Sequence, residues 1–137
     1  DRAKARVDEL SSGFPGSVLF TGRVPYDELP TYLSHSSVGI APFVINDKTA
    51  AINPNKLYVY AAMEQNIVST PFSKEIEDQR DLIYVASGPD DFARATIAAL
   101  GDDERRRAVR ERIAVPNSWD AKAREFAQLI SRVTGAS

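Results

Sequence analysis

The sequence predicts an α/β protein: a Rossmann-like open parallel sheet of about four strands, flanked by helices and followed by two or three C-terminal helices. Short apolar runs alternate along the chain with segments of helical periodicity, and this alternation is typical of α/β folds. The runs are mainly apolar, as expected for strands buried on both faces of a parallel sheet. With 137 residues and no long linker or internal repeat, the chain is predicted to form a single α/β domain over residues 1–137.

Four apolar runs are the predicted strands, and glycine or proline follows three of them closely. The runs are residues 18–21, 37–43, 67–70 and 83–86. Gly22 ends the first, Pro71 the third and Gly88 the fourth. Because helical segments separate the runs, the strands are predicted to be parallel and joined by right-handed crossovers.

The predicted helices are recognised by their periodicity and their ends. They cover residues 1–10, 26–34, 54–65 and 89–100, then about 102–113 and 118–133. Asn53 is a candidate cap for the third, with Pro54 at its first position, where the missing N–H costs nothing. In the helix over 89–100, one apolar face is predicted to lie on the sheet. Its members are Phe92, Ala93, Thr96, Ile97 and Leu100.

Composition and charge exclude several functional classes. The chain has no cysteine and a single histidine, His35, so disulfide scaffolds, zinc ribbons and thiol nucleophiles are excluded, and neither a metal site nor a cofactor is predicted. A net charge of −2 at pH 7 gives no general attraction to nucleic acid. The charged N-terminus resembles no targeting signal, and no apolar stretch approaches the roughly 20 residues that span a bilayer. These features predict a cytoplasmic protein.

The candidate site lies where ligands bind in open parallel sheets, beyond the carboxyl ends of the strands. Residues 44–53 form a loop that is long for such a connection, and it contains Asn46 and Asp47. The helix that follows brings its free N–H groups and Lys56 to this edge, a combination suited to a phosphate or another anion. The alternative is that Asn53 and Pro54 are only a good helix start, with Lys56 and Asp47 solvated at the surface.

Several segments, in the right order, carry a family resemblance. They are residues 20–24 (FTGRV), 26–33, 38–43 (VGIAPF), 53–58 (NPNKLY), 67–71 (IVSTP) and 118–119. Together they resemble the C-terminal, donor-binding half of group 1 bacterial glycosyltransferases with the GT-B architecture. The resemblance implies a Rossmann-like domain that binds a nucleotide-diphosphate sugar in a cleft between two domains.

The resemblance also assigns site residues. It implies that the turn at Gly22, Arg23 and Val24 lies near the nucleobase. It implies that Asn53, Pro54 and Lys56 face the diphosphate and sugar. Asn46 and Asp47 are candidate sugar contacts because of their place in the long loop, and a solvated Asp47 is the alternative. Val59 occupies a position that normally holds a glutamate in contact with the ribose, and Tyr60 is next to it.

The chain departs from the family pattern in three respects. Val59 and Ala51 stand where two glutamates are expected, so neither a catalytic residue nor retention or inversion of configuration is assigned. Glu64, Gln65 and Asn66 replace the usual Gly-x-Pro turn. The first strands of the donor half and the N-terminal acceptor domain are expected to be missing, which would leave an open sheet edge.

Two functional hypotheses follow. The first is the donor-binding part of a glycosyltransferase that acts in polysaccharide assembly, on a polysaccharide, lipid-linked or other acceptor. Its expected partners are the nucleotide sugar, the missing acceptor domain and, through that missing part, the inner face of the membrane. The 137-residue chain by itself is then expected to transfer no sugar. The second hypothesis is a non-catalytic, glycosyltransferase-like α/β remnant that serves as a structural or partner-binding module.

Overall fold

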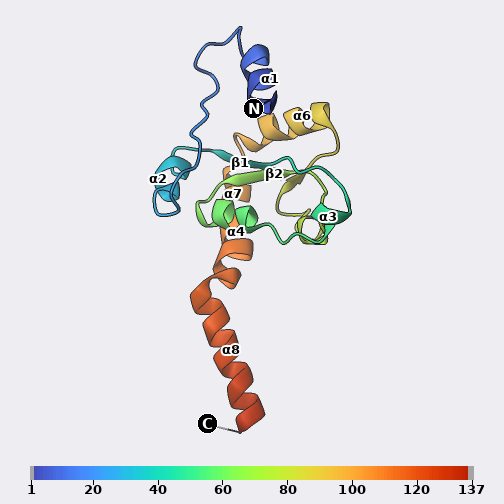
Figure 1. Cartoon of the computed structure of the whole chain (residues 1–137). Helices are drawn as coiled ribbons and strands as arrows, with labels where there is room; N and C mark the ends of the chain where they lie inside the picture. Colours follow the sequence, from blue (N-terminus) through green and yellow to red (C-terminus); the bar gives the residue numbers. More distant parts are fainter. Residues whose placement is uncertain (1, 136–137) are drawn as a thin grey trace.

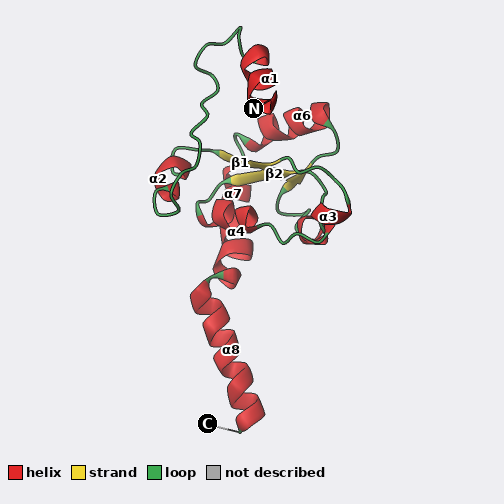
Figure 2. Cartoon of the chain, in the orientation of Figure 1, coloured by secondary structure: helices red, strands yellow, loops and turns green. Residues whose placement is uncertain are grey.

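A three-stranded parallel sheet lies at the centre of the computed structural model, which describes residues 2–135 (Figure 1, Figure 2). The strand order is β1 (Val38–Ala41), β2 (Asn66–Ser69) and β3 (Tyr84–Val85), with both pairs parallel. Gly39 pairs with Ile67, and Ser69 pairs with Val85. The fold class predicted from the sequence is therefore confirmed.

Helices lie on both sides of the sheet. The helices of the chain are α1 (Arg2–Leu10), α2 (Leu29–Leu33), α3 (Asp47–Ala50), α4 (Asn55–Ala62), α5 (Lys74–Asp78), α6 (Pro89–Ala99), α7 (Asp103–Val109) and α8 (Trp119–Thr134). A π-helical segment at Arg110–Ala114 and a 3₁₀ turn at Val115–Asn117 join α7 to α8. Figure 1 shows α6 above the strands, α4 below them and α8 extending away from the sheet. The sequence did not predict the two short helices α3 and α5.

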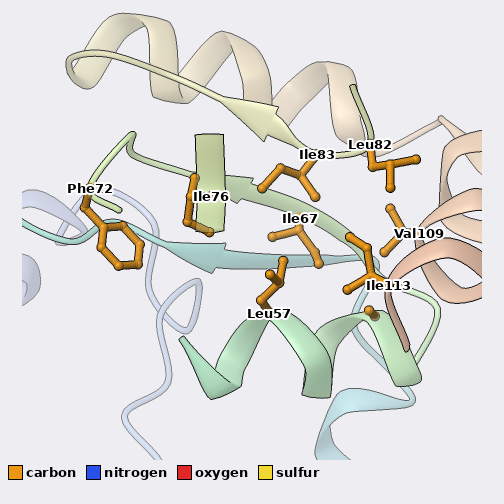
Figure 3. Close-up of a cluster of buried hydrophobic side chains, with 9 residues drawn as sticks. Leu57, Ile67, Phe72, Ile76, Leu82, Ile83, Val109 and Ile113 are labelled. Carbon is orange, nitrogen blue, oxygen red and sulfur yellow. The ribbon is translucent and has the colours of Figure 1, made fainter. Parts of the chain in front are cut away.

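The core lies between β2 and the helices around it (Figure 3). Its buried apolar members are Leu57, Ala61, Ile67, Phe72, Ile76, Leu82, Ile83, Val109 and Ile113. All four residues of β2 are buried, which explains why this strand is apolar in the middle. The core therefore joins α4, α5 and α7 to the sheet.

Two buried amides connect the start of β2 to distant parts of the chain. Asn66 Nδ2 donates hydrogen bonds to the carbonyl oxygens of Ala99 (2.6 Å) and Asp102 (2.9 Å), at the junction of α6 and α7. Gln65 Nε2 donates to the carbonyls of Leu33 (2.8 Å) and Ser36 (3.3 Å), where α2 ends. These bonds hold the helix ends at the amino edge of the sheet.

The strand predicted at residues 18–21 is absent, so about four strands become three. These residues are irregular and exposed, with Leu19 81% accessible. A strand needs a neighbour for its backbone hydrogen bonds, and within residues 2–135 this segment pairs with no other strand. An apolar run indicates the tendency to form a strand, whereas pairing depends on what lies beside it.

The apolar face predicted for α6 is only partly correct. Phe92 and Thr96 are half-buried, but Ile97 and Leu100 are 70% and 58% exposed. The buried residue of this helix is Ala99. Periodicity identifies an apolar stripe, but three short strands cover only part of it.

The last helix, α8, also exposes apolar side chains, including Trp119 (91% accessible), Phe126 and Val133. Ser118 caps it by accepting a hydrogen bond from the Ala121 amide, and Gly135 ends it in the left-handed conformation. Within residues 2–135, no helix combines the length and hydrophobicity needed to cross a bilayer.

Candidate functional site

The segments that follow β1 and β2 are tied together at the carboxyl edge of the sheet. Thr70 Oγ1 donates a hydrogen bond to the Phe43 carbonyl at 2.7 Å, and Ser69 Oγ donates to the Ala41 carbonyl at 3.2 Å. The Phe43 and Phe72 rings pack with their centroids 4.4 Å apart. Phe72 lies at the end of the core toward which β1 points (Figure 3). Hydrogen bonds and ring packing therefore fix the positions of these segments relative to each other.

The long loop after β1 is ordered by its own polar groups. Asn46 Oδ1 accepts hydrogen bonds from the amides of Lys48 (3.0 Å) and Thr49 (3.1 Å), and the Asn46 amide donates to Thr49 Oγ1 (3.0 Å). This capping box starts the one-turn helix α3, whose first residue is the exposed Asp47. The oxygen of Asn46 is thus occupied within the loop, and contact of Asn46 or Asp47 with a sugar stays a prediction.

Helix α4 begins one residue later than predicted. Pro54, not Asn53, is the N-cap, with extended backbone angles (φ −81°, ψ 105°), and the prediction that Asn53 caps the helix was wrong. A proline has no side-chain acceptor, so within the described chain no side chain caps this end of α4. The Leu57 amide donates to the Pro54 carbonyl at 2.9 Å, so the amides of Asn55 and Lys56 are the first-turn donors left for a ligand, with the helix dipole favouring negative charge there.

Lys56 lies in this first turn and is exposed. Its ammonium is 5.7 Å from the centroid of the Phe43 ring, on the segment that leaves β1. The cation is therefore held over the same edge at which α4 begins. Lys56 thus lies beside the start of α4, and its contact with a diphosphate stays a prediction.

A second polar group at this edge was not found from the sequence. The Tyr58 hydroxyl donates a hydrogen bond to Glu75 Oε1 at 2.9 Å, connecting α4 to α5. Partial burial raises the pKa of the Tyr58 phenol, and the bond to the Glu75 carboxylate raises this pKa further. A sequence pattern does not reveal a contact between residues 17 positions apart, and α5, the helix that carries Glu75, was not predicted.

Val59 faces an apolar pocket rather than open solvent. It lies in the second turn of α4, is half-buried, and lines a pocket of about 160 Å³ between α2 and α4. The other lining residues are Tyr26, Leu29, Pro30, Leu33, Ala62 and Met63. The pocket lining at Val59 offers no carboxylate for a ribose hydroxyl.

Tyr60 has a packing role in the structure. Its ring covers Gly39 in β1, and its hydroxyl donates a 3.4 Å hydrogen bond to the Ile40 carbonyl. Burial raises the pKa of the Tyr60 phenol. A ligand contact for Tyr60 is untested and stays a prediction.

The turn predicted to lie near a nucleobase precedes α2. Gly22 adopts a positive φ of 68°, Arg23 is exposed and Val24 is half-buried. Tyr26, two residues after Val24, lines the same pocket as Val59. The segment after Gly22 and the second turn of α4 therefore border one pocket, while the ligand contacts of Gly22, Arg23 and Val24 stay predictions.

The structure explains the residue that replaces glycine after α4. Glu64 has a left-handed backbone, with φ 55°, which is unfavourable for a residue that carries a Cβ. Its carbonyl accepts a 2.8 Å hydrogen bond from Arg106 Nε, and its carboxylate pairs with Arg110. Contacts with α7 and the π-helical segment thus offset the cost of a non-glycine residue at this turn.

A separate charged cluster starts α7. Asp102 accepts hydrogen bonds from the Tyr84 hydroxyl (2.7 Å), the Arg105 amide (3.0 Å) and Arg105 Nε (3.0 Å). The bond from Tyr84 is the main cause of the lowered pKa of the Asp102 carboxyl, and the Arg105 amide adds to it. These bonds cap α7 and fasten it to β3, so the cluster is explained by structure alone.

An open parallel sheet with an uncapped helix start and a lysine at its carboxyl edge defines a protein of the Rossmann-like α/β class. Residues 1–102 match the family of group 1 glycosyl transferases, and the chain belongs to this family. TuaH from Bacillus subtilis (strain 168), named as a teichuronic acid biosynthesis glycosyltransferase, is 27% identical over 115 residues. That match covers 80% of this chain but 29% of the relative, so the chain spans less than a third of TuaH. No solved structure matches significantly.

Proposed function

We propose that this chain is the donor-binding part of a glycosyltransferase and that it binds the diphosphate of a nucleotide sugar at the start of α4. The observation that carries the proposal is the uncapped first turn of α4, with Lys56 beside it, at the carboxyl edge of the sheet. Open backbone amides, the positive end of the helix dipole and a cation together favour a ligand with two adjacent phosphates.

Such a site also suits the chemistry of sugar transfer. When the bond between the sugar and the diphosphate breaks, negative charge grows on the departing diphosphate. Groups placed beforehand to bind that charge stabilise the transition state more than the ground state. The amides of α4 and Lys56 would have this role, so no metal or other cofactor is part of the proposal.

The remaining components of the reaction are proposed from the family. The acceptor is a polysaccharide, a lipid-linked sugar or another acceptor, and the name of TuaH places that relative in teichuronic acid biosynthesis. A separate N-terminal acceptor domain would complete the cleft, and the single α/β domain at residues 1–137 would supply the donor side. A cytoplasmic enzyme, in contact with the inner face of the membrane through that other domain, fits this assignment. Alone, the 137-residue chain is expected to transfer no sugar.

The proposal predicts that Lys56→Ala weakens binding of UDP or GDP by about 2 kcal/mol, or roughly 30-fold, because a charge-assisted hydrogen bond to phosphate is lost. Isothermal titration calorimetry measures the difference. Lys122→Ala is a matched control, since it removes the same charge from α8, a helix that extends away from this edge. Equal affinities of the Lys56 variant and the unmodified protein would exclude Lys56 from the site.

A second function, the non-catalytic α/β module, is favoured by Val59. Its half-buried side chain lines an apolar pocket where the family resemblance implies a ribose contact. If that contact has been replaced by packing between α2 and α4, the chain would serve as a structural or partner-binding module.

Val59→Glu separates the two functions. For the donor-binding protein, we expect the new carboxylate to accept hydrogen bonds from ribose hydroxyls and to tighten nucleotide binding by about 1–2 kcal/mol. Thermal melts with and without UDP or GDP, and with Val59→Gln as the uncharged control, measure this. A lower Tm that nucleotide does not restore would instead support the non-catalytic module.

A further inference from the structure

The side chain of Lys56 has a specific neighbour that the family resemblance does not assign. A lysine on the surface of a helix is flexible, and ordering it for a ligand costs side-chain entropy. Here the ammonium lies over the Phe43 ring, at 5.7 Å from the centroid. That distance is within the roughly 6 Å over which a cation is attracted to an aromatic face.

Phe43 is itself held from two sides. Its carbonyl accepts the 2.7 Å hydrogen bond from Thr70 Oγ1, which fixes its backbone to the end of β2. Its ring packs on Phe72 at 4.4 Å between centroids, and Phe72 is buried in the core. The end of β2 and the core therefore determine the position of the Phe43 ring.

We propose that Phe43 is a positioning residue for Lys56: its ring holds the ammonium at the carboxyl edge of the sheet, ready for the diphosphate. This inference rests on the proposed function, in which Lys56 binds that group. Phe43 does not contact the ligand. It acts by reducing the entropy that Lys56 loses when the diphosphate binds.

The substitution that isolates this role is Phe43→Leu, which keeps an apolar side chain against Phe72 but removes the aromatic face. We expect it to weaken binding of UDP or GDP by about 2–5-fold, the range of an exposed cation–π contact. Phe43→Tyr keeps the face and is expected to bind like the unmodified protein. In a Lys56→Ala background, Phe43→Leu is expected to have no further effect.

The calorimetric series distinguishes failure of the inference from failure of the proposed function. If Lys56→Ala weakens binding but Phe43→Leu does not, or if Phe43→Leu costs the same with and without Lys56, the positioning role is wrong. If Lys56→Ala has no effect, or neither nucleotide binds, the proposed function is wrong.

The positioning contact also has a test that needs no nucleotide. The ring current of Phe43 is expected to move the ε-methylene proton resonances of Lys56 upfield in the NMR spectrum. Phe43→Leu is expected to abolish that shift, whereas Phe43→Tyr retains it. Lys56 resonances at ordinary positions in the unmodified protein would overturn the inference, whatever the nucleotide affinity.

Discussion

Asn66→Asp is expected to lower the free energy of unfolding by about 4 kcal/mol. The Asn66 side chain is fully buried, and its amide nitrogen donates to two carbonyl oxygens, those of Ala99 and Asp102. The substitution replaces this donor with a carboxylate oxygen that faces both carbonyls. An uncompensated buried charge costs about 3–5 kcal/mol. Urea unfolding at neutral pH measures the loss.

Two further measurements test the reason for this loss. Asn66→Ala removes the donor without adding charge, so it is expected to cost about 2 kcal/mol through the unpaired carbonyls. The penalty of Asn66→Asp is expected to shrink at acidic pH, because a protonated carboxyl can donate one hydrogen bond. If Asn66→Asp lowered the free energy of unfolding by less than about 1 kcal/mol at neutral pH, the hydrogen bonds from the Asn66 side chain to Ala99 and Asp102 would not hold α6 and α7 in place.

The sheet was predictable because its strands are short, mainly apolar runs, although only β2 is buried along its whole length, and Ile40 in β1 is 46% exposed. Residues 37–43, 67–70 and 83–86 were predicted as strands, and β1, β2 and β3 lie within or next to them. The run at residues 18–21 has the same local character but no neighbouring strand in the described structure. Pairing is a tertiary property, so the sequence pattern alone could not separate this run from the other three.

The position of Lys56 was predictable because it depends on chain order, whereas its contact with a ligand stays a prediction. Lys56 follows Pro54 at a helix start between two strands, and topology alone brings such a position to the carboxyl edge of a parallel sheet. The contacts of Lys56 with Phe43, and of Tyr58 with Glu75, join residues far apart in the sequence. The polar turn at residues 64–66 was seen as a departure from the family, whereas the structure gives each of its side chains a partner.

Gly39→Ala is the second change with a large expected effect, about 3 kcal/mol. A Cβ at this position would lie 2.4–2.8 Å from three atoms of the Tyr60 ring, including Cγ, the ring atom bonded to the side-chain Cβ. The ring cannot swing away as a flexible chain end would, so α4 must shift from β1. Overpacking of this kind costs up to about 3 kcal/mol. Chemical denaturation of the variant measures the loss.

The origin of this loss can be isolated with Tyr60→Ala, which removes the ring from Gly39. In that background Gly39→Ala is expected to cost less than about 1 kcal/mol, a coupling of about 2 kcal/mol between the two positions. Since α4 also carries Lys56, the displaced helix of the single variant Gly39→Ala is expected to bind UDP or GDP more weakly than the unmodified protein. Equal losses with and without the Tyr60 ring would show that Gly39 is required for a reason other than the close approach of α4 to β1.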